Sequence, residues 1–185
     1  MEAFLISTGL VALAEIGDKT QLLALCLAAR FRKPLPIILG ILLATLLNHA
    51  LAGALGTWLS HTISHQTMRW ILGISFIAMA AWMLVPDSLD EPKENNARLG
   101  VLLTTLIAFF LIEIGDKTQI ATIALAAKYD ALTPVVTGTT LGMMIANVPA
   151  VWIGDAAATK LNVRLVQRIA AAIFAVLGVM VLASQ

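Results

Sequence analysis

The heptapeptide Glu15-Ile16-Gly17-Asp18-Lys19-Thr20-Gln21 recurs without a change as Glu113-Ile114-Gly115-Asp116-Lys117-Thr118-Gln119, 98 residues later (15 to 113). Each copy lies inside a long apolar stretch. An ionised side chain at the centre of a membrane costs about 2.5–3.5 kcal/mol on insertion scales. Two copies carry four carboxylates and two ammoniums, so the gross cost is about 15–20 kcal/mol if none is paired or hydrated. A cost of this size indicates a functional site, and it favours the chemistry of a cation.

The composition places the chain among membrane proteins. It has 185 residues, of which 59% are hydrophobic and 12% charged, whereas soluble domains are nearer one half apolar. A net charge of +1 and the lack of a basic run argue against nucleic-acid binding. The single cysteine, Cys26, excludes a disulfide within one chain, and we interpret it as a small buried hydrophobic residue. The N-terminus has no positive segment or cleavage site, so we expect the first helix to be retained.

The pattern of apolar stretches predicts an all-α integral membrane protein with six transmembrane helices. Each stretch approaches the roughly 20 residues that a bilayer crossing needs, and polar or proline-containing segments separate them. The predicted spans are approximately 3–29, 35–59, 68–85, 99–127, 133–154 and 166–184. Residues 1–85 form the first three-helix repeat, 86–98 a cytoplasmic linker and 99–185 the second repeat, within one transmembrane domain.

Lysine and arginine predict the orientation, because these residues are enriched in cytoplasmic loops. With the motif lysines set aside, the even-numbered loops hold only Arg69 and Lys128. The odd-numbered loops hold eight: Arg30, Arg32, Lys33, Lys93, Arg98, Lys160, Arg164 and Arg168. Loops one, three and five should therefore face the cytoplasm, with both termini periplasmic.

The repeat extends well beyond the motif. A shift of 98 residues also places Gly40 on Gly138 and His49 on Asn147. Because each half has three spans, an odd number, the second half must enter the membrane with the opposite polarity. Inverted repeats of this kind are typical of secondary transporters, whose sites lie at the midplane between the halves. The alternative, a duplicated helical bundle with no transport role, explains the duplication but not the acidic residues.

Within the motif, the two acidic residues and the glutamine recur at i, i+3 and i+6, which on a helix places them along one side. Gly17 permits either close approach of another helix or a local unwinding that frees backbone carbonyls for a ligand. If the two copies cross near the membrane centre, four carboxylates and two carboxamides converge. The candidate metal ligands are Glu15, Asp18, Gln21, Glu113, Asp116 and Gln119.

The chemistry of these ligands narrows the choice of cation. Hard oxygen atoms suit Mn²⁺, Ca²⁺ and Mg²⁺, while the lack of thiolates disfavours copper and a tight zinc site. Four clustered carboxylates cannot all stay ionised without a cation, so some should hold protons. An entering metal ion would expel those protons, so one set of groups would serve both directions of a cation/proton exchange.

Several neighbouring polar residues are candidate accessory groups. Lys19 and Lys117 stand at i+4 from the motif glutamates, a spacing that permits an intrahelical ion pair. Such a lysine either neutralises its glutamate for insertion or holds it until metal arrives. The threonines either add hydroxyl ligands or, as we prefer, bond back to the helix backbone. The asparagines are interhelical hydrogen-bond partners or part of the site. The histidine is either a proton relay or, as is more usual for a lone histidine, a packed or interfacial residue. These residues are Thr20, Thr118, Asn48, His49 and Asn147.

Two copies of E-x-G-D-[KR]-[TS], one in each three-span half, resemble the cation/proton antiporters that include Golgi and thylakoid manganese/calcium transporters and bacterial MneA-type manganese exporters. The resemblance covers all six spans. It implies divalent-cation transport, with Mn²⁺ or Ca²⁺ as substrate, protons as counter-ion and no cofactor. By position, it implies Glu15, Asp18, Glu113 and Asp116 as ligands. Long N-terminal extensions and a large central loop, usual in eukaryotic members, are missing, which implies a bacterial inner-membrane protein and manganese export.

Two other functions remain open at this stage. A passive divalent-cation channel would use the acids as a selectivity ring, with flux independent of a proton gradient. An exporter of small amines or amino acids would use them to bind ammonium groups. An enzyme is not expected, because no nucleophile is paired with a base and no cofactor motif is present. The expected partners are membrane lipid and a divalent metal ion, with no obligate protein partner and no nucleic acid.

Overall fold

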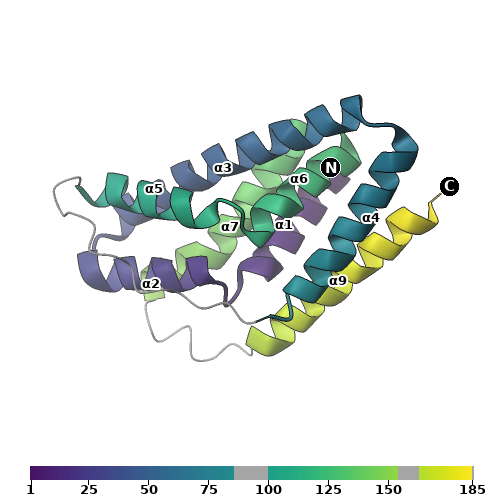
Figure 1. Ribbon diagram of the computed structural model, residues 1–185. Coiled ribbons are helices and arrows are strands. Elements are labelled where there is room, and N and C mark those ends of the chain that lie inside the picture. Colours follow the sequence, from purple (N-terminus) through teal and green to yellow (C-terminus); the bar gives the residue numbers. More distant parts are fainter. Residues whose placement is uncertain (86–99, 154–162, 185) are drawn as a thin grey trace.

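The computed structural model describes residues 1–85, 100–153 and 163–184. These residues form helices joined by short turns (Figure 1), which confirms the all-α prediction. The predicted linker 86–98 and most of the predicted fifth loop lie outside the described residues. The helices are α1 Glu2–Glu15, α2 Lys19–Phe31, α3 Pro34–Thr62, α4 His65–Trp82, α5 Gly100–Glu113, α6 Lys117–Tyr129, α7 Leu132–Ile153 and α9 Val163–Ala183.

The two motif segments, within the predicted spans 3–29 and 99–127, are not continuous helices. Of the two roles left open for Gly17, the structure has the local break in the helix. In the first segment, α1 ends at Glu15, and Ile16 (φ −65°, ψ 114°) and Gly17 (φ 80°) form a turn. The Asp18 amide donates to the Glu15 carbonyl at 3.0 Å. These are the features of a type II β-turn, whose third residue needs positive φ and is therefore usually glycine. The second motif repeats the turn, with Gly115 at φ 77° and an Asp116-to-Glu113 bond of 3.1 Å.

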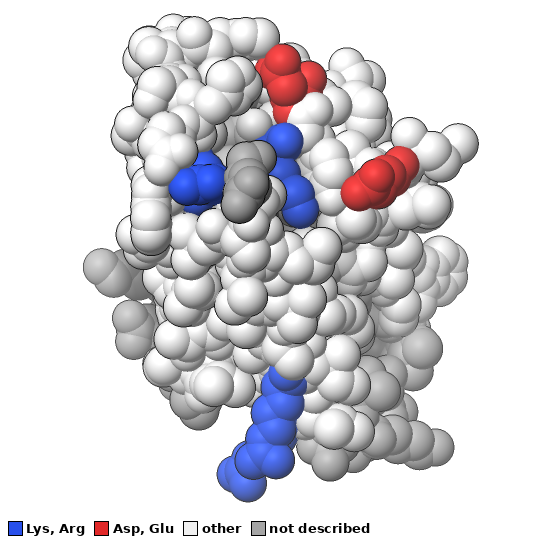
Figure 2. All heavy atoms as spheres, turned by 90° about the vertical axis from the view of Figure 1, so that its right-hand side faces the viewer, with Lys and Arg blue, Asp and Glu red and all other residues white. Residues whose placement is uncertain are grey.

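Three described segments are long and apolar enough to cross a membrane by length and composition: Pro34–Thr62, Leu132–Trp152 and Arg164–Ala183. The motif helices are shorter because the turn divides them, and α4 begins with polar residues that lower its hydropathy. Large apolar side chains nevertheless cover much of the outer surface, including Leu35, Leu39, Leu43, Leu46, Leu47, Leu51, Leu55 and Trp58 along α3. Such an apolar surface suits lipid rather than water. The face drawn in Figure 2, the right-hand side of Figure 1, carries few charged side chains, and most of them lie in its upper half.

Small residues let helices of one half pack closely on helices of the other. A Cβ added at Gly40 of α3 would lie 2.7 Å from the Thr105 Cβ of α5. A Cβ added at the corresponding Gly138 of α7 would lie 2.6 Å from the Phe4 carbonyl of α1. Thus α3 packs on α5 and α7 packs on α1, so the helix that follows each motif segment packs on the first helix of the other motif segment.

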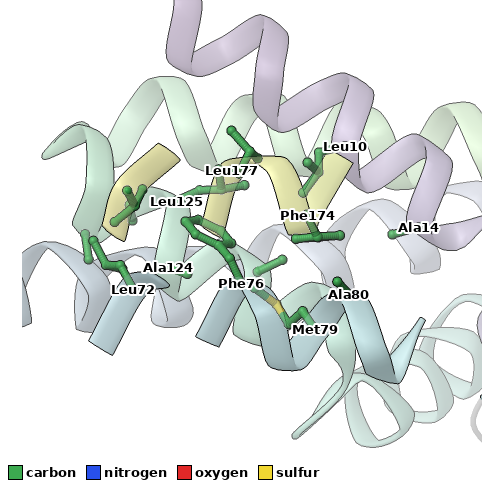
Figure 3. Packing of buried hydrophobic residues seen from close by; sticks show 14 of the residues in the cluster. Leu10, Ala14, Leu72, Phe76, Met79, Ala80, Ala124, Leu125, Phe174 and Leu177 are labelled. Carbon is green, nitrogen blue, oxygen red and sulfur yellow. The ribbon is translucent and has the colours of Figure 1, made fainter. Parts of the chain in front are cut away.

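The helices α4 and α9 form an antiparallel pair at one side of the molecule (Figure 1). Their apolar side chains join those of α1 and α6 in one buried cluster, drawn in Figure 3, which includes Leu10, Phe76, Leu125, Phe174 and Leu177. A second buried cluster joins α2, α3, α5 and α7. Because the motif turns connect α1 to α2 and α5 to α6, both turns lie where the chain passes from one apolar cluster to the other.

The two termini lie at the same end of the molecule (Figure 1). There Arg69 donates to the Ser184 carbonyl at 2.6 Å, and the Tyr129 hydroxyl donates to Glu2 at 3.4 Å. The interpretation of Cys26 as buried was wrong: its side chain is exposed on α2. In an apolar helix face directed at lipid, a small apolar side chain needs no protein neighbours.

Candidate metal site

Three carboxylates meet between the two motif turns. Glu15, Glu113 and Asp116 each offer an oxygen, and these oxygens all lie within 4.8 Å of one another. All three side chains are buried, with exposed fractions of 0%, 0% and 1%. The turns bring these side chains together. Glu15 and Glu113 are the last residues of α1 and α5, and the motif aspartates directly precede α2 and α6.

Each of these carboxylates uses one oxygen on a protein donor. The Thr20 hydroxyl donates to Glu15 Oε2, the Thr118 hydroxyl donates to Glu113 Oε2 at 3.2 Å, and the Lys19 ammonium contacts Asp116 Oδ1. The second oxygens, Glu15 Oε1, Glu113 Oε1 and Asp116 Oδ2, are buried and have no hydrogen-bond partner among the described residues. A buried acceptor without a partner costs about 1–3 kcal/mol, so three together indicate a ligand that binds them.

The motif threonines therefore differ from the sequence-based expectation. We preferred a bond back to the helix backbone, but both hydroxyls donate to the glutamate side chain five residues earlier. The β-turn makes this possible, because it brings the threonine at the start of the second helix back over the end of the first helix. The threonines thus orient the glutamates.

The motif lysines pair across the site rather than within their own helix, so the expectation of an intrahelical pair with glutamate was wrong. Lys19 Nζ lies 2.6 Å from Asp116 Oδ1, and Lys117 Nζ lies 3.5 Å from Asp18 Oδ1. The i+4 geometry needs a continuous helix, and the β-turn removes it. Each aspartate stands at the N-cap of its helix but pairs with the lysine of the other motif instead of capping.

The glutamines, expected as metal ligands, hold the turns in this conformation. Gln21 Oε1 accepts from the Gly17 amide at 2.9 Å, and Gln119 Oε1 accepts from the Gly115 amide at 2.7 Å. Gln21 Nε2 also donates to the Ala146 carbonyl of α7 at 3.0 Å. Their side-chain oxygens therefore face the glycine amides, and the Gln21 nitrogen joins the first motif to α7.

The accessory candidates of the second spans are buried close to the motif segments. Asn48 Nδ2 donates to the Phe110 carbonyl of α5 at 3.1 Å, one helical turn before Glu113. Asn147 Nδ2 donates to the Met143 carbonyl and lies 3.0 Å from its sulfur. Both Oδ1 atoms, and both ring nitrogens of His49, are buried without a hydrogen-bond partner in the described part of the chain. The asparagines thus act at least as hydrogen-bond partners, one of the two alternatives open from the sequence.

Sequence reasoning missed one aromatic residue. The ring of Trp82, at the end of α4, lies 5.9 Å from Lys117 Nζ, within the range of a cation–π contact. The corresponding position of the second repeat is Met180, so the repeat offers no matching ring there. A search for departures from the internal symmetry at the ends of the spans would have found this difference.

Comparison with known proteins identifies the family. The model of the divalent cation/proton antiporter GDT1 matches residues 3–91 and 101–185. A Vibrio cholerae protein named "Putative manganese exporter" is 53% identical over 175 residues, which cover 94% of this chain and 87% of that protein. The GDT1-like protein sll0615 of Synechocystis is 28% identical over 193 residues, covering 94% and 93%. GDT1-like protein 3 of Oryza sativa subsp. japonica is 28% identical over 199 residues, covering 94% and 71%. No solved structure matches the chain.

The family and the geometry agree on the chemistry. A buried group of acidic side chains with unpartnered oxygens offers the hard oxygen ligands that divalent cations take, and the matched family is one of multi-pass membrane transporters rather than enzymes. The family match covers nearly the whole chain, including both motif turns. This chain belongs to the GDT1 family of divalent cation/proton antiporters.

Proposed function

We propose that this antiporter exports Mn²⁺ in exchange for protons and binds the ion between the two motif turns. Three buried carboxylates with unpartnered oxygens carry the proposal: Glu15, Glu113 and Asp116. Asp18, paired with Lys117 in this conformation, is the fourth acidic ligand of the transport cycle. The name of the Vibrio cholerae relative supports manganese as the substrate, and Ca²⁺ is the alternative because it takes the same oxygen ligands.

Electrostatic repulsion within the cluster couples metal to protons. Two unit charges 4.8 Å apart repel by about 3–4 kcal/mol at an effective dielectric constant of 20. Three ionised carboxylates at this spacing therefore need either a cation or protons among them. A divalent ion supplies two positive charges at once. When the ion leaves, the carboxylates take up protons again, so the metal ion and the protons occupy the same site in turn.

The remaining polar residues support this site. In this conformation Gln21 and Gln119 accept hydrogen bonds from the glycine amides and hold the turns. They coordinate metal only after these hydrogen bonds break. Asn48 and Asn147 keep an unpartnered oxygen near the motifs and serve as accessory ligands. His49, with both ring nitrogens unpartnered in the described residues, is the candidate proton relay.

The transporter has six spans in two inverted repeats, residues 1–85 and 99–185, joined by the linker 86–98. Two short helices and a turn make one span in each repeat: α1 with α2, and α5 with α6. Supporting this, the end of α6 at Tyr129 contacts the start of α1 at Glu2, so these two segments run in opposite directions. Discontinuous helices of this kind are typical of transporter binding sites. The protein lies in a bacterial inner membrane with both termini periplasmic, as the lysine and arginine distribution favours.

Flux through the purified protein in proteoliposomes tests this function. Mn²⁺ and Ca²⁺ uptake is followed with and without an imposed pH gradient, together with a dye that reports internal pH. We expect Mn²⁺ movement that depends on the gradient and carries protons the other way. Metal movement indifferent to the gradient would show a channel. No movement of either metal would favour the export of small amines or amino acids.

A further inference from the structure

The two motif lysines have identical local sequences but unequal surroundings. Lys19 has a side chain that is 23% exposed, and Lys117 one that is 4% exposed. Their aspartate partners are both nearly fully buried. In this conformation Lys19 is therefore partly accessible, whereas Lys117 is buried.

Lys19 contacts the carboxylate cluster itself. Its ammonium lies 2.6 Å from Asp116, one of the three clustered carboxylates, and interacts electrostatically with Glu113 and Asp18. The lysine is thus a cation already placed at the group of oxygens that a metal ion would use. A flexible four-carbon stem with partial exposure lets this ammonium move away without a rearrangement of the core.

Lys117 contacts an aspartate outside that cluster. Its partner Asp18 is not among the three carboxylates that meet within 4.8 Å. The face of the Trp82 ring lies 5.9 Å from its ammonium. Burial, the aspartate and the ring together fix this lysine in place.

We propose that the Lys19 ammonium is a tethered counter-ion that a divalent cation must displace from Asp116, whereas Lys117, held beneath Trp82, stays paired with Asp18 when the ion binds. This division of roles rests on the proposed Mn²⁺ function of the same carboxylates. It assigns the accessible side of the site to Lys19. It also makes Lys19 a determinant of affinity, because each metal ion that binds competes with an ammonium that cannot diffuse away.

The internal duplication supplies the matched variants. Mn²⁺ binding to the purified protein is measured from the electron paramagnetic resonance signal of free Mn²⁺ at one fixed pH. Lys19→Met removes the competitor, and we expect its Kd to fall about ten- to hundredfold, the range of a charge-assisted hydrogen bond. The gain in Lys117→Met should be at least about tenfold smaller. Lys128→Met, at the far end of α6, controls for the loss of one positive charge.

Each outcome separates this inference from the proposed function. Equal gains in Lys19→Met and Lys117→Met would overturn the division of roles, and weaker binding in Lys19→Met would show that Lys19 supports the site. If the wild-type protein and all variants bind no Mn²⁺, the proposed function fails instead.

A second measurement needs no variant, so it stands even if Lys19→Met fails to fold. The wild-type protein is acetylated with acetic anhydride in detergent, with and without Mn²⁺, and the modified lysines are counted by mass spectrometry. We expect Mn²⁺ to raise the modification of Lys19 several-fold and to leave Lys117 protected. Protection of Lys19 by Mn²⁺, or equal exposure of both lysines, would contradict the proposed displacement.

Discussion

The turns at residues 15–21 and 113–119 have the same seven residues and the same backbone, yet different surroundings. Both form a type II turn closed by a glutamine. Around the first, Lys19 is partly exposed and Gln21 contacts α7. Around the second, Lys117 is buried beneath Trp82.

The difference arises from the pair α4 and α9. Both helices pack on the side formed by α1 and α6, so the end of α4 covers the start of α6 (Figure 1). A transporter needs a site that opens to one side at a time. In this structure the two equal motifs have unequal settings, because the packing leaves one lysine partly exposed and buries the other.

Loss of a clustered carboxylate should have the largest effect. We expect Asp116→Asn to lower Mn²⁺ transport at least about a hundredfold, because it removes a charged ligand and leaves Lys19 without its partner. Asp18→Asn should lower transport by a similar factor, since the cycle needs both aspartates. Proteoliposome flux measures both, and Mn²⁺ binding separates them: only Asp116→Asn should abolish binding as well. Substantial flux in either variant, inserted normally in the membrane, would refute the shared site.

Removal of the threonine hydroxyls tests how unequal the glutamates are. Thr20→Val removes the hydrogen bond from Thr20 to Glu15 and should lower kcat/KM for Mn²⁺ about tenfold or more. Thr118→Val should cost less, because the Thr118 contact with Glu113 is longer, at 3.2 Å. Valine matches threonine in shape, so packing is preserved. A larger effect in Thr118→Val would show that the second motif, not the first, carries the more important glutamate.

The turn glycines should affect stability. Gly115→Ala forces a Cβ into the left-handed region at φ 77°, although nothing lies within 4 Å of that Cβ, and we expect a loss of about 1–2 kcal/mol. Gly9→Ala is the control, since Gly9 lies inside α1 with equal free space. It should stabilise the protein by about 0.5–1 kcal/mol. Thermal unfolding in detergent measures both variants, and a neutral Gly115→Ala would argue against the type II turn.

Removal of the Trp82 ring beside Lys117 should have the smallest effect of these changes. Trp82→Leu removes the ring, and a cation–π contact contributes about 0.5–2 kcal/mol. Acetylation of Lys117 should therefore rise about two- to thirtyfold, and Trp82→Phe should restore most of the protection. Trp70→Leu, on the exposed part of the same helix, controls for the general loss of a tryptophan. Unchanged protection in Trp82→Leu would remove the structural reason for the difference between the lysines.

Much of this site was predictable from local sequence, but the conformation of the motif was not. The identical acidic heptapeptides marked the functional residues, and Gly17 allowed a local unwinding. The intrahelical lysine–glutamate pairs were wrong, because that i+4 spacing needs a continuous helix and a turn interrupts each motif segment. Glycine at the third position of Glu-Ile-Gly-Asp was the available signal for a type II turn.

The sequence by itself determined the class of protein, the motif residues and the positive charge of the bound ion. The length of the apolar stretches and the acidic residues within them can be read from the chain alone. The tertiary structure decided which carboxylates meet, that Lys19 and Lys117 pair across the repeats, and that Trp82 covers only one of them. These contacts join residues about a hundred positions apart. Their geometry depends on how α3, α7 and the α4–α9 pair pack against the turns, and no local pattern encodes that packing.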